Sequence, residues 1–244
     1  MSKVLLVTGA GRGIGAAVAR AAGKAGYRVV VNYSRSKEAA ESVVRDIKAA
    51  GGEAVAIQGD MASETDIVAL FAAIDRTYGR LDALVNNAGV IGPRGRVENL
   101  EAAGIAELLA VNVTSVFLCA REAVKRMSTK HGGKGGAIVN IGSAATRLGG
   151  SGEYVPYAAS KGAVNTLTIG LAKEVALEGI RVNTVEPGLI ATDIHYEGRL
   201  DKLGPTVPMG RVAPPEEVAG PVLFLLSDAA SYITGSIVTV SGGR

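Results

Sequence analysis

The sequence predicts an α/β fold in which a doubly wound parallel sheet carries helices on both faces. Short apolar runs alternate with longer amphipathic stretches along the whole chain. Several of these runs are almost continuously apolar, as in strands that are buried on both faces. Strands separated by helices imply right-handed crossovers, and such crossovers build a parallel sheet.

The expected strands are the short apolar runs Val4 to Thr8, Arg28 to Asn32, Ala54 to Gly59, Ala83 to Asn86, Ala137 to Ile141, Arg181 to Val185 and Ser236 to Val240. Helical periodicity connects them. The stretch from Glu38 to Ala50 is the clearest example, because its apolar residues share one face. They are Ala40, Val43, Val44 and Ile47. The region from Leu189 to Ala213 shows no clear period, and so long a loop is usually functional.

Length and composition suit one domain that spans residues 1–244. A chain of this length buries a substantial core. Glycine supplies 33 residues and aromatic residues only 4%, which favours tight turns and close packing over an aromatic binding surface. The formal net charge is +3 and the cations are dispersed, so no nucleic-acid partner is expected.

The sequence also gives reasons to expect neither a disulfide, nor a metal site, nor a membrane partner. The single cysteine, Cys119, cannot form an intramolecular disulfide, and its apolar neighbours indicate a small core side chain. With one Cys and two His, a zinc site made of protein ligands alone is not expected. The first apolar run, Val4 to Val7, is too short for a signal peptide or a membrane span, so we expect a cytoplasmic protein.

The segment from Tyr157 to Lys161 indicates proton-transfer chemistry. A helix places positions i and i+4 on one face, so the Lys161 ammonium can lie beside the Tyr157 phenol. A unit charge at roughly 4 Å contributes up to about 4 kcal/mol at an effective dielectric near 20. Half of that energy would lower the pKa of Tyr157 by about 1.5 units, toward the range of a general acid. By spacing alone the pair could be an accident of the helix surface. Tyr154 has Ala158 four positions on, so it is expected to remain an ordinary phenol.

A glycine-rich turn follows the first expected strand. The common fingerprint G-x-G-x-x-G fails there because its third glycine is replaced by Ile14. The pattern G-x-x-x-G-x-G fits instead, on Gly9, Gly13 and Gly15. Glycine lets the backbone turn sharply and approach a pyrophosphate, whose charge then meets the N-terminus of the next helix. The alternative is an ordinary glycine-rich turn after a strand.

Together these motifs resemble the short-chain dehydrogenase/reductase family. Ser143 ends an apolar run fourteen positions before Tyr157, and the segment from Asn86 to Gly89 reads Asn-Asn-Ala-Gly. The resemblance runs from Val4 to Gly243, with the motifs in the family's order and spacing. It implies a Rossmann fold and an enzyme that transfers a hydride between a nicotinamide and a carbonyl or alcohol substrate, while the protein supplies position and charge.

The resemblance implies a role for each catalytic candidate. Ser143 would hold the substrate oxygen, and Tyr157 would exchange the proton. Lys161 would lower the pKa of Tyr157 and hydrogen-bond the nicotinamide ribose. Asn112 would hold a water in the proton relay, although a polar residue tolerated inside a helix is the alternative. No metal is needed.

The resemblance also implies a set of cofactor-binding residues along the sheet edge. Asp60 would bind the adenine amino group, and Asn87 to Gly89 would form the wall behind the adenosine ribose. Turn chemistry is the alternative, because Asp, Asn and Gly are common where strands end. The full set is Gly9, Arg12, Gly13, Ile14, Gly15, Asn32, Tyr33, Ser34, Arg35, Asp60, Met61, Asn87, Ala88, Gly89, Tyr157, Lys161, Pro187, Gly188, Ile190 and Thr192.

The end of the second expected strand favours NADP over NAD. Enzymes of this fold that prefer NAD usually place a carboxylate about 20 residues beyond the glycine turn to bind the ribose 2′-hydroxyl. Here Asn32 stands at that place, and no acid appears before Glu38. Arg12 and Arg35 can pair with a 2′-phosphate instead. The alternative is that both are solvated surface arginines.

Several features bear on substrate and partners. Specificity for a small carbonyl or alcohol substrate should lie in the loop from Leu189 to Ala213, with help from Ile91 to Val97 and Thr146 to Glu153. A 3-oxoacyl-acyl-carrier-protein reductase is the alternative within the enzyme class. Basic residues could bind an acidic carrier protein, although a solvated helix end is favoured; they are Arg121, Lys125, Arg126, Lys130 and Lys134.

Two further expectations concern assembly and enzyme class. Small and apolar side chains cover much of Ala102 to Met127 and Val155 to Glu178, which predicts a homotetramer. A dinucleotide-binding redox sensor without catalysis is the alternative outside the enzyme class. It is not favoured, because such proteins are expected to lose the Tyr or the Lys of the motif.

Overall fold

The computed structural model describes residues 2–244 and forms a parallel sheet of seven strands in the order β3-β2-β1-β4-β5-β6-β7. Every neighbouring pair is parallel. The strands are β1 (Val4–Val7), β2 (Arg28–Tyr33), β3 (Glu53–Gln58), β4 (Ala83–Asn86), β5 (Gly136–Ile141), β6 (Ile180–Pro187) and β7 (Ile237–Val240). The predicted fold class is confirmed, and each expected strand lies within two residues of its observed bounds.

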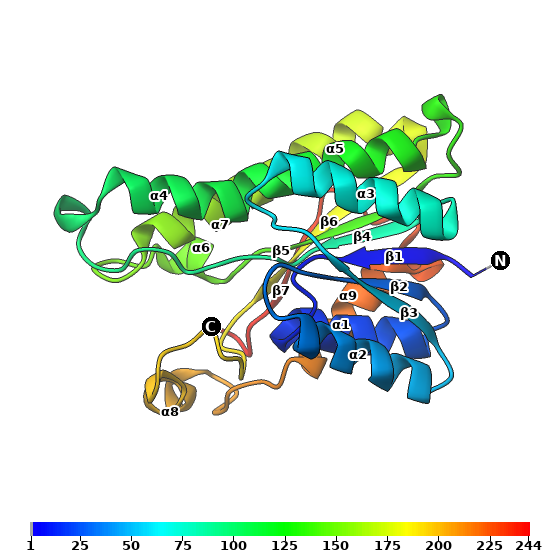
Figure 1. The fold of residues 1–244 in the computed structure, drawn as a ribbon. Coiled ribbons are helices and arrows are strands. Elements are labelled where there is room, and N and C mark those ends of the chain that lie inside the picture. The colour runs from blue at the N-terminus through cyan, green and yellow to red at the C-terminus, as the bar shows by residue number, and fades with distance from the viewer. Residues whose placement is uncertain (1) are drawn as a thin grey trace.

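Helices cover both faces of the sheet (Figure 1). They are α1 (Gly13–Lys24), α2 (Lys37–Ala49), α3 (Glu64–Tyr78), α4 (Ala102–Leu109), α5 (Ser115–Met127), α6 (Ala145–Leu148), α7 (Val155–Val175), α8 (Arg199–Leu203) and α9 (Glu216–Leu226). Helices α1, α2 and α9 pack on one face, and α3, α5 and α7 pack on the other.

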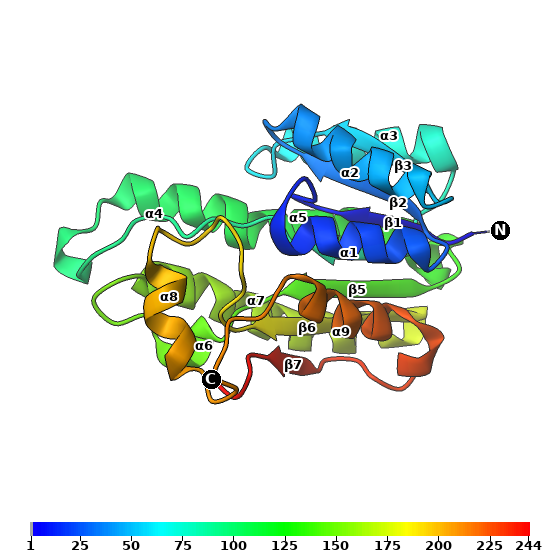
Figure 2. The ribbon, with the colours of Figure 1, turned by 90° about the horizontal axis from the view of Figure 1, so that it is seen from below.

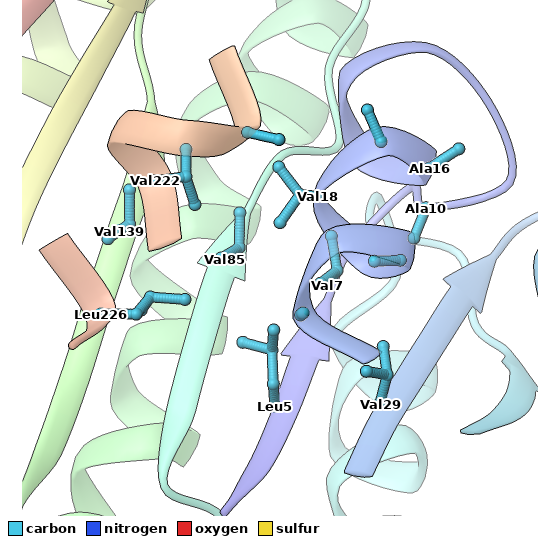
Figure 3. Close-up of a cluster of buried hydrophobic side chains, with 14 of the residues drawn as sticks. Leu5, Val7, Ala10, Ala16, Val18, Val29, Val85, Val139, Val222 and Leu226 are labelled. Carbon is cyan, nitrogen blue, oxygen red and sulfur yellow. The ribbon is translucent and has the colours of Figure 1, made fainter. Parts of the chain in front are cut away.

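The core is made of small aliphatic side chains on each face of the sheet. Figure 3 shows the cluster between α1, α9 and the central strands, in which Val18 and Val222 face Val7, Val85 and neighbouring strand residues. All four residues of β1 are buried, as expected for a strand covered on both faces. Helix α2 buries the four apolar residues that the sequence periodicity selects, Ala40, Val43, Val44 and Ile47.

The long helix that the sequence predicts over Ala102 to Met127 is continuous but contains a π-helical turn at Ala110–Thr114, between α4 and α5. Its outer face is apolar: Phe117 is 55% exposed, and Leu109 and, on neighbouring α7, Ile169 are exposed as well. Among the described residues this run alone is long and apolar enough to pass a length-and-composition test for a membrane span. One such helix is weak evidence for a membrane span, because the test considers only length and composition.

The region from Leu189 to Ala213 is not wholly irregular, which corrects the sequence expectation. It contains α8 and a 3-10 turn at Gly204–Thr206, both too short to show a period in the sequence. Figures 1 and 2 place α8 beyond the sheet, at the end of the molecule where the strands finish and where α4 and α6 also lie. The order of strands reverses between β1 and β4, and ligands of doubly wound sheets bind at the carboxyl ends beside that point.

Candidate active site

A cavity of about 560 Å³ lies at the carboxyl ends of the strands and joins the predicted cofactor and catalytic motifs. All the predicted site residues line it except Gly15 and Asn112. Predicted site residues as far apart in the sequence as Gly9 and Thr192, 183 positions, thus line the same cavity. The sequence motifs therefore converge on a single cleft.

The glycine turn is built for close approach of a ligand. Gly9 and Gly13 have φ of +61° and +53°, which L side chains rarely adopt. A Cβ on Gly15 would lie 2.4 Å from Asn87 Nδ2 and 2.7 Å from the Gly9 carbonyl oxygen. Asn87 Nδ2 donates to the carbonyls of Thr8 and Gly9, at 2.9 and 3.0 Å, and so fixes the turn against β4. Helix α1 begins at Gly13 and directs its N-terminus at the cavity.

Asn32 lines the cavity, but its side chain is held by backbone groups around it. It is only 1% exposed. Its Nδ2 donates to the carbonyls of Ile57 and Gly59, and its Oδ1 accepts from the Gly9 amide at 3.1 Å. Asn32 therefore supports the glycine turn from beneath. Tyr33, Ser34 and Arg35 follow it on the cavity wall.

The two arginines predicted to meet a 2′-phosphate differ in their surroundings. Arg35 is exposed on the cavity wall and makes no ion pair with any residue from 2 to 244. Arg12 is also exposed, but its Nη1 donates to Asp193 Oδ2 at 2.6 Å. The glycine turn is thereby linked to the loop that carries α8. Sequence spacing could not reveal this pair, because its members are 181 positions apart.

After β3, at the same edge of the sheet, the residues predicted for the adenine side take the geometry of a turn and still line the cavity. Asp60 Oδ1 accepts from the Ala62 amide at 3.0 Å, so part of the carboxylate caps the turn. Met61 is buried against Cys119, with 3.8 Å between the two sulfur atoms. Cys119 is buried as predicted, and burial raises its pKa to about 12, which leaves the thiol protonated and inert.

Ser143, Tyr157 and Lys161 come together at the ends of β5 and α7. Ser143 Oγ accepts from the Ala145 amide at 3.1 Å, and the side chain also acts to lower the pKa of Tyr157. Lys161 Nζ lies 5.8 Å from the centroid of the Tyr157 ring and donates to the Ile141 carbonyl at 2.7 Å. The three groups that proton transfer to a carbonyl oxygen requires are thus adjacent.

The pKa directions at this cluster differ from the sequence expectation. Burial raises the pKa of Tyr157, and only the Ser143 side chain opposes that rise. Burial also lowers the pKa of Lys161 to about 8. The predicted lowering of the Tyr157 pKa by Lys161 is absent, because the ammonium is directed at the Ile141 carbonyl rather than at the phenol oxygen. Tyr157 is therefore held as a protonated donor.

Asn112 lies in the π-helical turn, behind the catalytic cluster rather than on the cavity wall. Its Oδ1 accepts from the Val90 amide at 2.8 Å, and its Nδ2 donates to the Val90 carbonyl and to Ser160 Oγ. A Cβ on Gly89 would lie 3.4 Å from Asn112 Oδ1 and 3.6 Å from Lys161 Nζ. The side chain therefore holds the strand-end loop beside Lys161, and π-bulges of this kind are frequent at functional sites.

Sequence reasoning missed Arg199, which lines the cavity from α8. It is 8% exposed and forms an ion pair with Glu153. His195, which is half-buried, lines the same cavity; burial lowers its pKa, and Arg199 lowers it further, so the imidazole is neutral at neutral pH. Nothing in the sequence pattern indicates that a charged residue in a segment without periodicity is buried. Only the folded structure shows that Arg199 lines the cavity.

Comparison with known proteins agrees with the geometry of this cleft. A family model described as enoyl-(acyl carrier protein) reductase matches residues 9–244. The crystal structure of a short-chain dehydrogenase from Burkholderia cenocepacia J2315 in complex with NADP superposes with a TM-score of 0.91, at 34% identity and covering 99% of this chain and 97% of that one. The chain belongs to the short-chain dehydrogenase/reductase family.

Two relatives in sequence extend the likeness over the whole chain. The uncharacterized oxidoreductase YgfF of Escherichia coli K12 is 52% identical, over 99% of both chains. A 3-oxoacyl-[acyl-carrier-protein] reductase of Synechocystis sp. is 41% identical, over 99% of this chain and 96% of the relative. The protein is therefore an oxidoreductase of this family, and the family uses a nicotinamide cofactor.

Proposed function

We propose that this protein is an NADP(H)-dependent oxidoreductase that interconverts a carbonyl and a secondary alcohol on a small molecule. The observation that carries the proposal is the convergence of the glycine turn with Ser143, Tyr157 and Lys161 in one cleft. Gly9 and Gly13 line the cavity with positive φ, and a glycine-rich turn of this kind lets the backbone approach a dinucleotide pyrophosphate. The cofactor supplies the hydride chemistry when bound.

In the proposed mechanism the protein holds the substrate and moves its proton. Ser143 hydrogen-bonds the substrate oxygen, and Tyr157 donates its proton to that oxygen as negative charge develops during reduction. In oxidation Tyr157 removes the proton from the alcohol. Lys161, held by the Ile141 carbonyl, would bind the ribose beside the nicotinamide. Asn112 supports this group through its contacts with the strand-end loop and with Ser160. In the proposal it would also hold a water that connects the group to solvent.

The preference for NADP(H) rests on Arg35 and Arg12, since no carboxylate stands at the ribose end of β2. Hydrogen bonds to charged groups contribute about 1.5 to 3 kcal/mol each when well formed. Because both arginines are exposed, we expect the pair together to give a preference of only about ten- to several-hundredfold. The preference should appear in cofactor affinity, because the 2′-phosphate is remote from the reacting carbon.

The test is to assay a panel of aldehydes, ketones, diketones, quinones, β-ketoesters and polyols with each of the two cofactors. Turnover is measured by the change in absorbance of the nicotinamide cofactor. We expect higher catalytic efficiency with NADP(H), eroded by Arg35→Ala and by Arg12→Ala. Arg20→Ala, which removes an exposed arginine paired with Asp46 outside the cleft, is the matched control. Equal or better efficiency with NAD(H) would show that Arg12 and Arg35 are surface residues.

The alternative of a carrier-protein-bound substrate draws on the Synechocystis relative, which is named a 3-oxoacyl-[acyl-carrier-protein] reductase. The basic residues that would bind an acidic carrier are mostly engaged within the chain. Arg121 pairs with Glu64, Lys125 with Glu122, Arg126 with Asp75 and Lys130 with Glu178, at distances from 2.7 to 3.1 Å. These pairs reduce the free positive charge, so a small-molecule substrate is favoured.

We further propose one domain over residues 1–244, a cytoplasmic location and a homotetramer. The exposed apolar side chains of Phe117, Leu109 and Ile169 support subunit contacts across α4, α5 and α7. β7 is the edge strand of the sheet, with half-exposed apolar residues, and supports a second contact. Light scattering at micromolar concentration should give four times the chain mass of 24.8 kDa, and a monomer mass would contradict the proposal.

A further inference from the structure

A second tyrosine of the cleft has a cationic partner. Arg199 Nη2 donates to Tyr154 Oη at 3.1 Å, and the guanidinium carbon lies 5.1 Å from the centroid of the Tyr154 ring. Sequence spacing shows only that Tyr154 has no lysine one turn along as a partner, so it does not reveal this contact. The partner of Tyr154 comes instead from α8, 45 positions further along the chain.

Tyr154 lies close enough to Tyr157 for one small molecule to contact both phenols. The ring centroids are 6.1 Å apart and the rings meet edge to face, at an interplanar angle of 79°. Both side chains line the cavity. Because Tyr157 is assigned to the reacting oxygen, Tyr154 is available for a different oxygen of the same substrate.

The polarity of the Tyr154 hydroxyl is set by Arg199. The phenol oxygen accepts from the guanidinium, so its own hydrogen is free to donate into the cavity. Such an arrangement polarises the hydroxyl and makes it a stronger donor. The donor therefore matches a substrate atom that accepts a hydrogen bond, such as a carbonyl oxygen.

The charges around this donor favour a neutral acceptor over an anion. Glu153 forms an ion pair with Arg199, so the guanidinium already has a counter-charge. His195, which also lines the cavity, has a lowered pKa and is uncharged. Ile91, Val111, Leu148 and Ile194 add apolar surface, while the lining also carries charges of both signs, on Glu107 and Arg244. A carboxylate would have to compete with Glu153, whereas a ketone or ester oxygen would not.

We propose that Tyr154 is a specificity-determining residue that binds a second, neutral carbonyl oxygen of the substrate, and that Arg199 is its positioning residue. The preferred substrates are then small dicarbonyl compounds whose second oxygen lies within reach of Tyr154 while the first is bound by Ser143 and Tyr157. This assignment rests on the proposed function, because it concerns the same cleft.

The test compares butanedione with butanone, which differ by one carbonyl oxygen, as substrates of wild-type enzyme and variants with NADPH. Tyr154→Phe should lower kcat/KM for butanedione by about 2- to 12-fold, the contribution of one hydrogen bond, and should leave butanone within about twofold. The loss should appear mainly in KM, since the second oxygen does not react. Ratios of variant to wild type cancel the different intrinsic reactivities of the two ketones.

Arg199 is tested by the same ratio and by a double-mutant cycle. Arg199→Gln should reproduce the selective loss on butanedione, Arg199→Lys should recover part of it, and the double variant with Tyr154→Phe should lose no more than the worse single variant. If Arg199→Gln unfolds, Tyr154→Phe alone decides. Equal losses on both ketones, or no loss on butanedione, overturn the inference and leave the proposed function standing. Wild-type enzyme that does not reduce butanedione also overturns the inference, and the proposed function falls only if the whole carbonyl and alcohol panel fails.

Discussion

Asp193→Asn should tighten NADPH binding, because Asp193 holds one of the two arginines assigned to the 2′-phosphate. Arg12 Nη1 lies 2.6 Å from Asp193 Oδ2, and the two side chains are 72% and 57% exposed. Exposed ion pairs contribute about 0.2 to 1 kcal/mol. Releasing Arg12 from this pair should therefore lower the Kd for NADPH by about 1.4- to 5-fold.

The assay is fluorescence titration of wild type and variant with NADPH and with NADH. NADH lacks the 2′-phosphate, so its Kd should not change, and added salt should reduce the NADPH effect. Asp46→Asn, which frees Arg20 from a comparable exposed pair away from the cleft, should change neither Kd. Unchanged or weaker NADPH binding by Asp193→Asn would refute the assignment of Arg12 to the phosphate.

Three further predictions concern Lys161 and the glycine turn. Burial lowers the pKa of Lys161 to about 8, so its ammonium is lost as the pH rises through that value. Because Tyr157 stays protonated there, kcat/KM for reduction should fall above pH about 8 through the loss of the Lys161 charge. A level profile above that pH would contradict the role of Lys161. Gly15→Ala should lower the free energy of unfolding in urea by about 1–3 kcal/mol, because the added Cβ overpacks against Asn87 and Gly9, and it should weaken cofactor binding. The control is Gly220→Ala, which should not lower the free energy of unfolding because its Cβ meets nothing within 4 Å. Asn32→Asp should lower the free energy of unfolding by about 1–3 kcal/mol, because the Ile57 and Gly59 carbonyls lose their hydrogen-bond donor. The substitution should therefore not act as a simple switch toward NAD. An unfolding free energy equal to that of wild type would show that Asn32 is not needed there.

The sequence predicts the sheet well because burial of parallel strands leaves a direct pattern. Near-continuous apolar runs mark the seven strands, and the four apolar residues of α2 fall on the buried face as their spacing requires. The glycine turn is also predictable, because positive φ at Gly9 and Gly13 and the lack of room for a Cβ at Gly15 require glycine at fixed spacings in the sequence. These features are predictable because they depend on residues that are close together in the sequence.

What the sequence does not predict is which polar groups meet across the fold. The side chain of Asn32 binds Gly9, Ile57 and Gly59, and no spacing rule shows these contacts. The direction of the Lys161 ammonium depends on the Ile141 carbonyl at the end of β5. The pairs of Arg12 with Asp193 and of Arg199 with Tyr154 require the loop after β6 to fold back over the cleft.

The central claim is that Tyr157 transfers the proton during reduction, and turnover by Tyr157→Phe with NADPH and butanone tests it most directly. Removing the hydroxyl leaves the ring and the glycine turn in place, so NADPH should bind with nearly the wild-type Kd in a fluorescence titration. We predict that turnover is almost wholly lost while this binding is kept, and that Tyr154→Phe, assayed in parallel, retains turnover. A Tyr157→Phe enzyme that binds NADPH and still reduces butanone at a rate close to that of wild type would contradict the account.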